Sequence, residues 1–167
     1  MSTVWLGIGT NIGDRLSHIR KAVSALESGL THIIMAGIYE TAPMDFLEQP
    51  DFLNTVLRAD TDLRPLELLA FLHETEAAGG RERLENSVEK GPRIIDIDIL
   101  LFDELCTVLK AENGNDLIIP HKSMHERLFV LKPLLDLDSD LADPRDGVLW
   151  SVKASQIKGQ RVMLYQR

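Results

Sequence analysis

Two aspartates set into an apolar stretch are the residues of this sequence most suited to chemistry. Residues 91–103 read GPRIIDIDILLFD, and Asp96 and Asp98 interrupt a run that is typical of a buried β-strand. Side chains alternate between the two faces of a strand, so the carboxylates would share a face, roughly 7 Å apart. Two such anions raise each other's pKa unless a cation neutralises them. Because Mg²⁺ prefers carboxylate oxygen and keeps positions open for phosphate, the pair predicts a nucleotide–metal site.

An isolated Asp-x-Asp is also common on exposed edge strands, where both carboxylates are hydrated, and this alternative stays open. The alternation places four apolar residues on the opposite face: Ile95, Ile97, Ile99 and Leu101. Arg93 would point the same way as these residues, away from the aspartates, if the strand were regular there. A bend at Gly91-Pro92 would change that direction.

A charged loop precedes the two aspartates. Its basic residues lie within thirteen positions: Arg81, Arg83, Lys90 and Arg93. Acidic residues alternate with them, so the loop fits a solvated segment of mixed charge as well as it fits an anion-binding patch. The net charge of the chain is −8, so an anionic ligand would need such a patch or a metal.

Two other motifs near the N-terminal half have alternative interpretations. Phe52 and Asn54 share one face of a predicted strand, where an aromatic ring and a carboxamide suit a flat heterocycle with an amide edge. A core position with a satisfied polar group is the commoner interpretation of such a pair.

The glycines of GIGTNIG have the spacing G-x-G-x-x-x-G, which does not match the dinucleotide-binding pattern. We interpret this motif as a strand ending in a tight turn, with Gly9 allowing a ligand to approach the backbone.

Histidines and charged residues gather at two helical segments. His73 and Glu76 lie three apart on a predicted helix and so share a face, for which a solvated surface is the first interpretation. The stretch PHKSMHER, residues 120–127, places His121, His125 and Arg127 before an apolar helix. The two histidines lack the H-E-x-x-H pattern of a zinc pair. A basic rim at a helix start, suited to phosphate, is the functional interpretation, and an ordinary capped helix is the alternative.

The periodicity of apolar residues predicts the elements that must position these groups. Helices are expected over three ranges: 15–30, with Asp14 as N-cap, 65–78 and 123–137. Strands are expected over 3–9, 33–40, 52–61 and 94–102, with a short helix and the strand GQRVMLY in the tail. This order predicts an α+β fold, a ferredoxin-like antiparallel sheet with helices packed on one face and extra C-terminal elements. We expect a single domain over residues 1–167.

Composition limits the classes of protein to which the chain could belong. Hydrophobic residues make up 44% of it, as in globular proteins, and no apolar run approaches the roughly 20 residues of a membrane span. The N-terminus has no signal-peptide pattern, and the single Cys106 excludes an internal disulfide. The acidic balance argues against nucleic acid or an anionic membrane as partner. We therefore expect a cytoplasmic protein, and a monomer because no large apolar stripe is left after the core is assigned.

Five segments in order resemble the 6-hydroxymethyl-7,8-dihydropterin pyrophosphokinase family. They are LGIGTNIGDR, IYETAP, QPDFLNTVL, GPRIIDIDILLFD and IPHKSMHERLFVLKPL, which together cover about residues 3 to 137. The resemblance implies transfer of pyrophosphate from ATP to 6-hydroxymethyl-7,8-dihydropterin in folate biosynthesis, with release of AMP. It also implies two Mg²⁺ ions, held by Asp96 and Asp98.

The resemblance further implies roles for residues along the chain. The catalytic set is Arg81, Arg93, Asp96 and Asp98. The ATP-binding set is Glu76, Arg81, Arg93, Ile99, His121 and Arg127. The pterin-binding set is Gly9, Thr41, Ala42, Met44, Phe52, Asn54 and Phe129. Residues 80–92 would form a lid that closes over ATP.

The chain departs from the family pattern at four positions, namely Leu84, Lys90, Lys122 and Leu128. These departures concern the lid and nucleotide affinity, not the metal and pterin positions. Three alternatives to an active pyrophosphokinase therefore stay open. They are a non-catalytic pterin- or nucleotide-binding relative, a ferredoxin-like interaction module without a small ligand, and a metal-dependent phosphohydrolase that uses the same aspartates.

Overall fold

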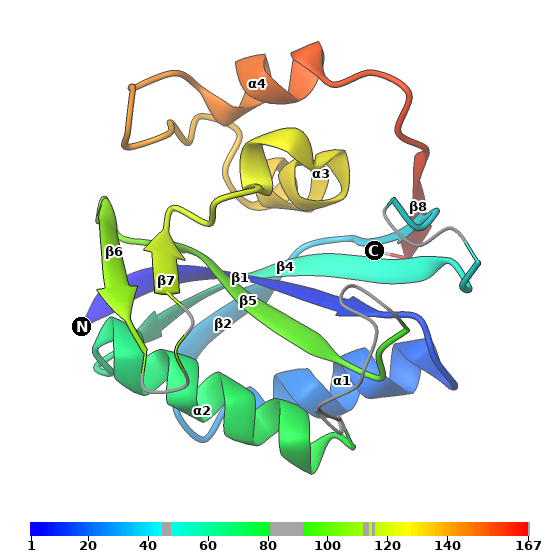
Figure 1. Ribbon diagram of the computed structural model, residues 1–167, viewed down its shortest axis with the longest axis horizontal. Coiled ribbons are helices and arrows are strands. Elements are labelled where there is room, and N and C mark those ends of the chain that lie inside the picture. Colours follow the sequence, from blue (N-terminus) through cyan, green and yellow to red (C-terminus); the bar gives the residue numbers. More distant parts are fainter. Residues whose placement is uncertain (45–47, 81–91, 112–113, 115, 167) are drawn as a thin grey trace.

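A six-stranded antiparallel sheet forms the centre of the fold (Figure 1). The computed structural model describes residues 1–44, 48–80, 92–111, 114 and 116–166. The sheet order is β5-β1-β4-β3-β8, and β2 also pairs with β4. The strands are β1 (Ser2–Thr10), β2 (Thr31–Met35), β3 (Ile38–Thr41), β4 (Phe52–Thr61), β5 (Asp96–Phe102) and β8 (Val162–Gln166). The central order is that of a ferredoxin-like sheet, which confirms the predicted fold class.

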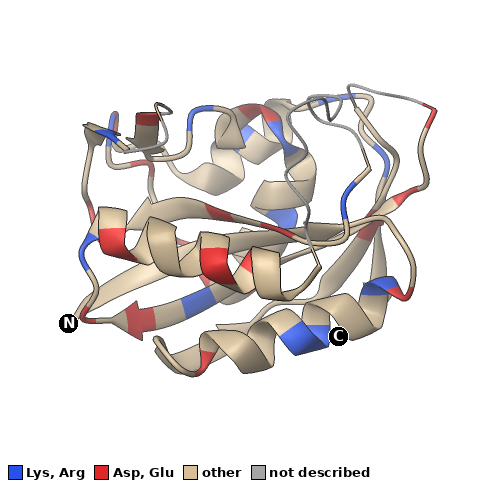
Figure 2. Ribbon diagram, turned by 60° about the horizontal axis from the view of Figure 1, so that its bottom comes forward, with Lys and Arg blue, Asp and Glu red and all other residues tan. Residues whose placement is uncertain are grey.

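Helices cover both faces of this sheet (Figure 1). Helices α1 (Arg15–Leu26) and α2 (Pro65–Ala78) lie on one face, where their apolar residues form the larger core with β1 and β5. Helices α3 (Leu128–Leu137) and α4 (Trp150–Gln156) lie on the other face over a second core. The expectation of helices on one face therefore holds for α1 and α2 only. In Figure 2 the charged residues of α2 are acidic and those of α1 are basic.

The ends of several elements differ from the predicted ranges. Helix α1 is capped by Asp14, whose side chain accepts from the Ser17 N–H at 3.1 Å, and it ends at Leu26 rather than at residue 30. The strand predicted over 33–40 is split into β2 and β3 by a break at Ala36-Gly37. The helix predicted over 123–137 is a 3₁₀ turn, η1 (Met124–Glu126), followed by α3. Helix α2 and strand β4 have the predicted bounds.

A small hairpin outside the main sheet was not predicted from the sequence. It consists of β6 (Thr107–Lys110) and β7 (Asp116–Ile119), which pair with each other in a separate two-stranded sheet. Each strand has only four residues, which is too short for alternation to stand out from its polar neighbours. The hairpin matters because β7 contributes to the cleft described below.

A β-bulge alters the predicted alternation in β5. Leu6 pairs with Ile99 and Trp5 with Leu101, so Leu100 is the extra residue that has no partner in the register. An extra residue of this kind reverses which face the following side chains take. Leu101 therefore packs with Trp5 in the second core, and the prediction that it shares a face with Ile95, Ile97 and Ile99 is wrong. The two aspartates precede the bulge and keep their common face.

Asp143 is a buried aspartate that forms ion pairs within the C-terminal part of the chain. Its side chain is fully buried and binds the guanidinium of Arg145 and the ammonium of Lys153. Both cations also lie over the ring of Trp150, at 5.7 and 5.1 Å from its centre. These donors hold the pKa of Asp143 well below its usual range, despite its burial.

Replacing Asp143 with alanine is expected to lower the free energy of unfolding by about 3 kcal/mol, because Arg145 loses its anion beside a buried ring and Lys153 keeps only its contact with Asp146. Urea denaturation would measure this change. The matched control is Asp140→Ala, which removes an exposed aspartate from the same region. We expect the control to change stability by less than about 0.5 kcal/mol. Equal losses of unfolding free energy in the two variants would show that the buried Asp143 cluster does not stabilise the fold more than an exposed aspartate does.

Candidate active site

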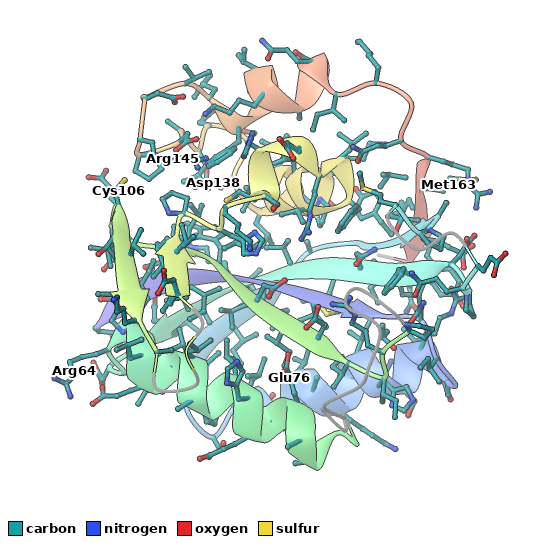
Figure 3. The ribbon with its side chains drawn as sticks, in the orientation of Figure 1. Arg64, Glu76, Cys106, Asp138, Arg145 and Met163 are labelled. Atoms are coloured by element: carbon teal, nitrogen blue, oxygen red, sulfur yellow. The ribbon has the colours of Figure 1, made fainter. Side chains whose placement is uncertain are left out.

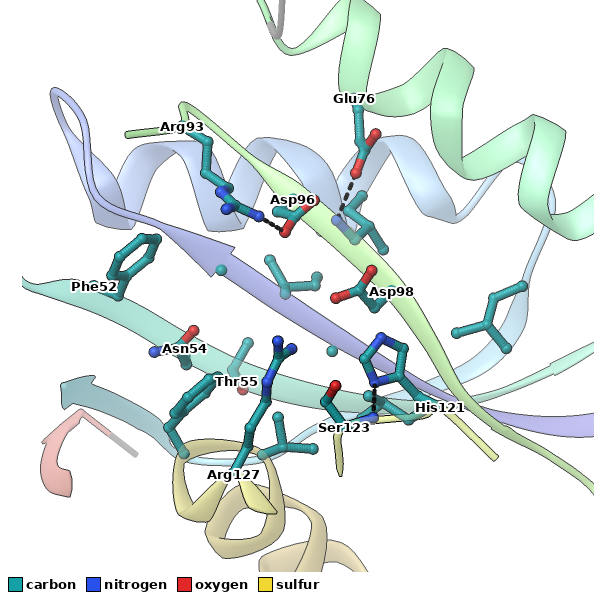
Figure 4. Close-up of a pocket in the computed structure, with 18 of the residues that line it drawn as sticks. Phe52, Asn54, Thr55, Glu76, Arg93, Asp96, Asp98, His121, Ser123 and Arg127 are labelled. Carbon is teal, nitrogen blue, oxygen red and sulfur yellow. Dashed lines mark hydrogen bonds and ion pairs between the residues drawn. The ribbon is translucent and has the colours of Figure 1, made fainter. Parts of the chain in front are cut away.

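One cleft of about 930 Å³ brings together the residues predicted to do chemistry. Strands β1, β4 and β5 form its floor, α2 lines one side, and the segment from His121 to Val130 lines another (Figure 4). The predicted site residues that line it are Gly9, Thr41, Ala42, Met44, Phe52, Asn54, Glu76, Arg93, Asp96, Asp98, Ile99, His121, Arg127 and Phe129. Arg81 and most of the predicted lid, residues 81–91, lie outside the described residues.

The register of the sheet places a residue from each end of the cleft in the same row. Gly9 of β1 pairs with Asp96 on one side and with Asn54 on the other, so the three lie in one row across the sheet. Paired residues of neighbouring strands share a face. A Cβ atom on Gly9 would lie 2.9 Å from the Asn54 Oδ1 atom, closer than van der Waals contact allows. The glycine therefore keeps open the floor between the carboxylates and the carboxamide, which explains the first part of GIGTNIG.

Aromatic and amide groups form one end of the cleft. Asn54 is 7% exposed and donates from Nδ2 to the Thr41 hydroxyl at 2.8 Å. That bond fixes the carboxamide with its Oδ1 atom toward Gly9. Phe52 lies on the same face of β4, two residues away, and Phe129 lines the cleft from α3. The set can hold a flat ring between aromatic faces and recognise its polar edge.

The pKa of the Asp98 carboxyl group is strongly perturbed. Burial, followed by the charge of Asp96 and then of Glu76, raises the pKa of Asp98 to about 7, although Arg127 and Arg93 act in the opposite direction. The Asp96 and Asp98 side chains are both partly buried, so the interpretation as hydrated aspartates on an exposed edge is wrong. The conflict between these anions is what a divalent cation would relieve.

Arg93 turns toward the aspartates. Strand β5 begins at Asp96, so Arg93 precedes the regular alternation, and its guanidinium forms an ion pair with the Asp96 carboxylate. The prediction for a regular strand therefore does not apply here. The bend was expected at Gly91-Pro92, and Gly91 lies outside the described residues. A guanidinium beside this carboxylate can also reach an anionic ligand bound there.

The site provides a donor set for a hard cation. Two carboxylates on one strand face are oxygen ligands of the type that Mg²⁺ prefers, with room for phosphate and water to complete its shell. In the described part of the chain, no group of three or more His, Cys, Asp or Glu side chains could hold a metal ion. The arrangement therefore fits a metal that arrives with a ligand better than a closed structural site.

The raised pKa of Asp98 makes the stability of the metal-free protein depend on pH. The folded-state pKa lies above the ordinary value of 3.8, so the contribution is fully present below that value and is lost as pH rises toward 7. We expect Asp98→Asn to remove this loss. In EDTA, the free energy of unfolding of the variant, measured relative to that of the unaltered protein, should rise by about 1–3 kcal/mol from pH 5 to pH 8. Urea denaturation at both pH values would measure the gain, and parallel pH profiles would contradict the assignment.

Glu76 is buried rather than solvated. Its side chain is 2% exposed, and its Oε1 atom accepts from the Ile97 backbone N–H at 2.7 Å. Figure 3 shows it pointing from α2 toward the sheet. Because β5 is an edge strand, its outward N–H groups need partners from another element, and α2 supplies one. The interpretation of His73 and Glu76 as a solvated face is therefore wrong for Glu76, and both residues line the cleft.

His121 and Arg127 provide hydrogen-bond donors on the side of the cleft near Asp98 (Figure 4). Burial, followed by the charges of Arg127 and Lys122, lowers the pKa of His121 to about 4, so the ring is neutral at pH 7. Its Nδ1 atom accepts from the Ser123 N–H at 3.3 Å, which leaves the hydrogen on Nε2. The Arg127 guanidinium lies 5.8 Å from the centre of the Phe129 ring.

The basic rim predicted at a helix start consists of side chains that precede helix α3, and His121, Lys122 and Arg127 line the cleft. Helix α3 begins at Leu128, and the Leu128 N–H donates to the Gln160 side chain at 2.9 Å. The side chains before the helix therefore supply the positive charge and donors. His125 contacts Glu126 at 3.4 Å and does not line the cleft with His121, in agreement with the rejection of a zinc pair.

Sequence reasoning missed several residues of the cleft. Leu69 of α2 and Ile118 of β7 add apolar surface, and Gln49 and Asp116 add polar groups. The β7 residues were missed together with their hairpin. Gln49 lies in a turn-rich segment that no periodicity marks, and the only signal for it was its place three residues before Phe52.

The fold and site define an α+β protein whose cleft places a carboxylate pair and cationic side chains beside an aromatic–amide end. Comparisons agree with such a small-molecule site. A model of the family described as 7,8-dihydro-6-hydroxymethylpterin-pyrophosphokinase matches residues 5–139. The chain therefore belongs to the 7,8-dihydro-6-hydroxymethylpterin-pyrophosphokinase family.

Two similar proteins are named 2-amino-4-hydroxy-6-hydroxymethyldihydropteridine pyrophosphokinase. The protein of Aquifex aeolicus (strain VF5) is 39% identical over 144 residues, which cover 86% of this chain and 85% of the relative. The protein of Bacillus subtilis (strain 168) is 40% identical over 135 residues, which cover 80% of this chain and 76% of the relative.

Other relatives are longer than this chain. The bifunctional protein FolKE of Lactococcus lactis subsp. lactis (strain IL1403) is 42% identical over 139 residues, which cover 82% of this chain and 38% of the relative. The structure of wild-type Plasmodium falciparum HPPK-DHPS matches with a TM-score of 0.74 and 16% identity, over 93% of this chain and 44% of that chain. At that identity the match supports the fold alone. Within the described residues, no helix is both long and apolar enough to cross a membrane.

Proposed function

We propose that this chain transfers pyrophosphate from ATP to 6-hydroxymethyl-7,8-dihydropterin, giving AMP and the pterin diphosphate in folate biosynthesis. The observation that carries the proposal is the row Asp96–Gly9–Asn54, which puts a carboxylate suited to metal and phosphate next to a carboxamide suited to the pterin edge. Family membership and the names of similar proteins support the same reaction.

The pterin would occupy the aromatic–amide end. Phe52 and Phe129 would contact the faces of the ring, and Asn54 would pair with its amide edge. Thr41, Ala42 and Met44 would complete this end, where Thr41 orients the Asn54 carboxamide. Because Gly9 has no side chain, the hydroxymethyl group could lie over β1 and point toward Asp96.

The triphosphate would occupy the end with the aspartates. Asp96 and Asp98 would hold Mg²⁺, with two ions expected, and the metal would offset the charge of the triphosphate and of the transferring group. Arg93, Arg127 and His121 would donate hydrogen bonds to phosphate oxygens. Glu76 and Ile99 would lie near the nucleoside, in agreement with their places in the cleft. Arg81 would add charge from the loop outside the described residues.

The reaction needs positioning and charge stabilisation more than covalent catalysis. The pterin hydroxyl oxygen forms a bond to the β-phosphorus, while the bond from that phosphorus to the α,β-bridging oxygen breaks and AMP leaves. The hydroxyl proton must be accepted, and Asp98 is our candidate acceptor because of its place at the site. An Asp98→Asn variant that binds Mg·ATP normally and keeps full turnover would exclude that role.

A product assay tests the proposed function against its alternatives. The protein is incubated with Mg²⁺, ATP and 6-hydroxymethyl-7,8-dihydropterin, and AMP, ADP, phosphate and pterin diphosphate are quantified. We expect AMP and pterin diphosphate in equal amounts, and neither without pterin. ADP with free phosphate in the absence of pterin would indicate a phosphohydrolase instead. Ligand binding without turnover would indicate a binding protein, and no binding an interaction module.

Adding a methyl group at Gly9 should selectively weaken pterin binding. Asn54 would have to move away from the new Cβ atom, and its bond to Thr41 opposes that movement. We expect Gly9→Ala to raise the KM for the pterin at least about tenfold, a cost of about 1.4 kcal/mol, with the KM for ATP nearly unchanged. The control is Asp140→Ala, which changes an exposed residue that does not line the cleft. Equal changes in both KM values would contradict this reading.

A further inference from the structure

Asn11 joins three segments of the chain beneath the cleft. Its side chain is 2% exposed. The Nδ2 group donates to the Gln49 side-chain oxygen at 2.9 Å and to the Pro50 carbonyl oxygen at 3.1 Å. The Oδ1 atom accepts from the Arg93 N–H at 2.9 Å, and the Asn11 N–H donates to the Arg93 carbonyl oxygen at 3.1 Å. One carboxamide thus connects the end of β1 with the segments before β4 and before β5.

Each of these segments leads directly to one end of the cleft. The residues bound by Nδ2 come shortly before Phe52, at the aromatic–amide end. The residue bound by Oδ1 is Arg93, whose guanidinium contacts Asp96 at the other end. Because Asn11 bonds both the N–H and the carbonyl of Arg93, the backbone there is held on both sides while the side chain extends into the cleft.

Only a carboxamide suits this position. The group must accept from one N–H and donate two hydrogen bonds to oxygen atoms, which asparagine does and aspartate cannot. An aspartate at this position would turn an oxygen toward two other oxygens, and an alanine would remove the side-chain acceptor of the part-buried Arg93 N–H.

We propose that Asn11 is a positioning residue that couples the pterin end of the cleft to Arg93. This inference rests on the proposed function and deepens it, because it gives the second half of GIGTNIG a role. Pterin bound between Phe52 and Phe129 holds the segment at Gln49 and Pro50. Asn11 transmits that restraint to the backbone of Arg93, so that the guanidinium is in place for the transferring group when both substrates are bound. Binding at the two ends is therefore cooperative, and the cooperativity is reciprocal.

The test compares Asn11→Ala and Asn11→Asp with Asp14→Ala, a control in the same turn that caps α1 and is outside the catalytic set. Calorimetry gives the affinity for the pterin with and without Mg²⁺ and α,β-methylene-ATP, a non-reacting analogue. We expect the analogue to enhance the pterin affinity of the unaltered protein. Asn11→Ala should lose most of that enhancement, lower kcat by about 10- to 100-fold, and change the KM for ATP by less than about threefold. Asn11→Asp should be worse, and Asp14→Ala should change stability alone.

Hydrogen exchange supplies a readout that does not depend on activity. The amides of Gln49, Asp51 and Phe52 and those at 93–96 should lose protection together in the Asn11 variants and keep it in Asp14→Ala. If Asn11→Ala does not fold, Gln49→Ala removes one of the two acceptors and should show a smaller loss of the same coupling. Unchanged coupling and kcat in a folded Asn11→Ala, or equal losses in Asp14→Ala, would overturn the inference. If the unaltered protein makes no AMP, the proposed function fails. Hydrogen exchange still tests the role of Asn11 in that case: loss of protection in both segments of the Asn11 variants supports the coupling, and loss in one segment alone contradicts it.

Discussion

Replacing Asp96 or Asp98 with alanine should lower kcat for AMP formation by at least about 10³-fold, because the proposed reaction depends on charge neutralisation at this strand. The two carboxylates lie on one face of β5 before the bulge, and Asp96 begins the row that leads across Gly9 to Asn54. Burial and mutual repulsion already raise the pKa of Asp98 to about 7. Either substitution removes half of the proposed metal-binding pair and leaves the triphosphate facing the remaining carboxylate without its counter-charge.

The measurement is the rate of AMP and pterin diphosphate formation at saturating substrates, over a range of Mg²⁺ concentrations. Glu104→Ala is the matched control, since it removes an exposed carboxylate shortly after the same strand. The control should keep its rate, and both aspartate variants should stay folded, because their loss relieves a charge conflict. A loss below about tenfold in both variants would contradict the proposed metal site, since a ligand of a catalytic metal is worth far more.

Replacing Arg93 with alanine is the second large effect that we expect, a fall in kcat of about 10²- to 10³-fold. The Arg93 guanidinium is placed by its backbone bonds to Asn11 and by its ion pair with Asp96, at the point where the β-phosphorus would be attacked. Arg93→Lys keeps the charge but loses the planar set of donors, so we expect it to recover only part of the rate.

Steady-state kinetics with both substrates separate this role from simple binding. A residue that acts on the transition state lowers kcat, whereas one that binds substrate uniformly raises KM. Arg64→Ala is the control, because Arg64 is an exposed arginine paired with Glu67 at the start of α2. An Arg93→Ala variant with normal kcat and a raised KM for ATP alone would assign Arg93 to nucleotide binding and not to catalysis.

The regular elements of this fold follow closely from local patterns. Strand β4 and helix α2 have the predicted bounds because each has a strong period, and α2 also has Pro65 in its first turn and glycines at its end. The split of residues 33–40 and the β6–β7 hairpin were missed, since four-residue strands hardly display a period. The bulge at Leu100 depends on the pairing partner in β1, which no local pattern contains.

The sequence predicted the residue types of the site better than their burial and orientation. Its residue types came from the motifs, and the resemblance grouped them, but the burial of Glu76 depends on how α2 covers the edge of the sheet. Arg93 turns inward because β5 starts three residues later, and Asn11 is defined entirely by long-range hydrogen bonds. The cytoplasmic location, the monomeric state and the lid remain predictions.

The most direct test of the central claim is anomalous diffraction from crystals grown with Mn²⁺ in place of Mg²⁺, α,β-methylene-ATP and 6-hydroxymethyl-7,8-dihydropterin. The account predicts metal peaks in contact with the Asp96 and Asp98 carboxylates and with phosphate oxygens, and the pterin ring beside Asn54. Metal and triphosphate bound away from these two carboxylates, with both substrates ordered in the crystal, would contradict it.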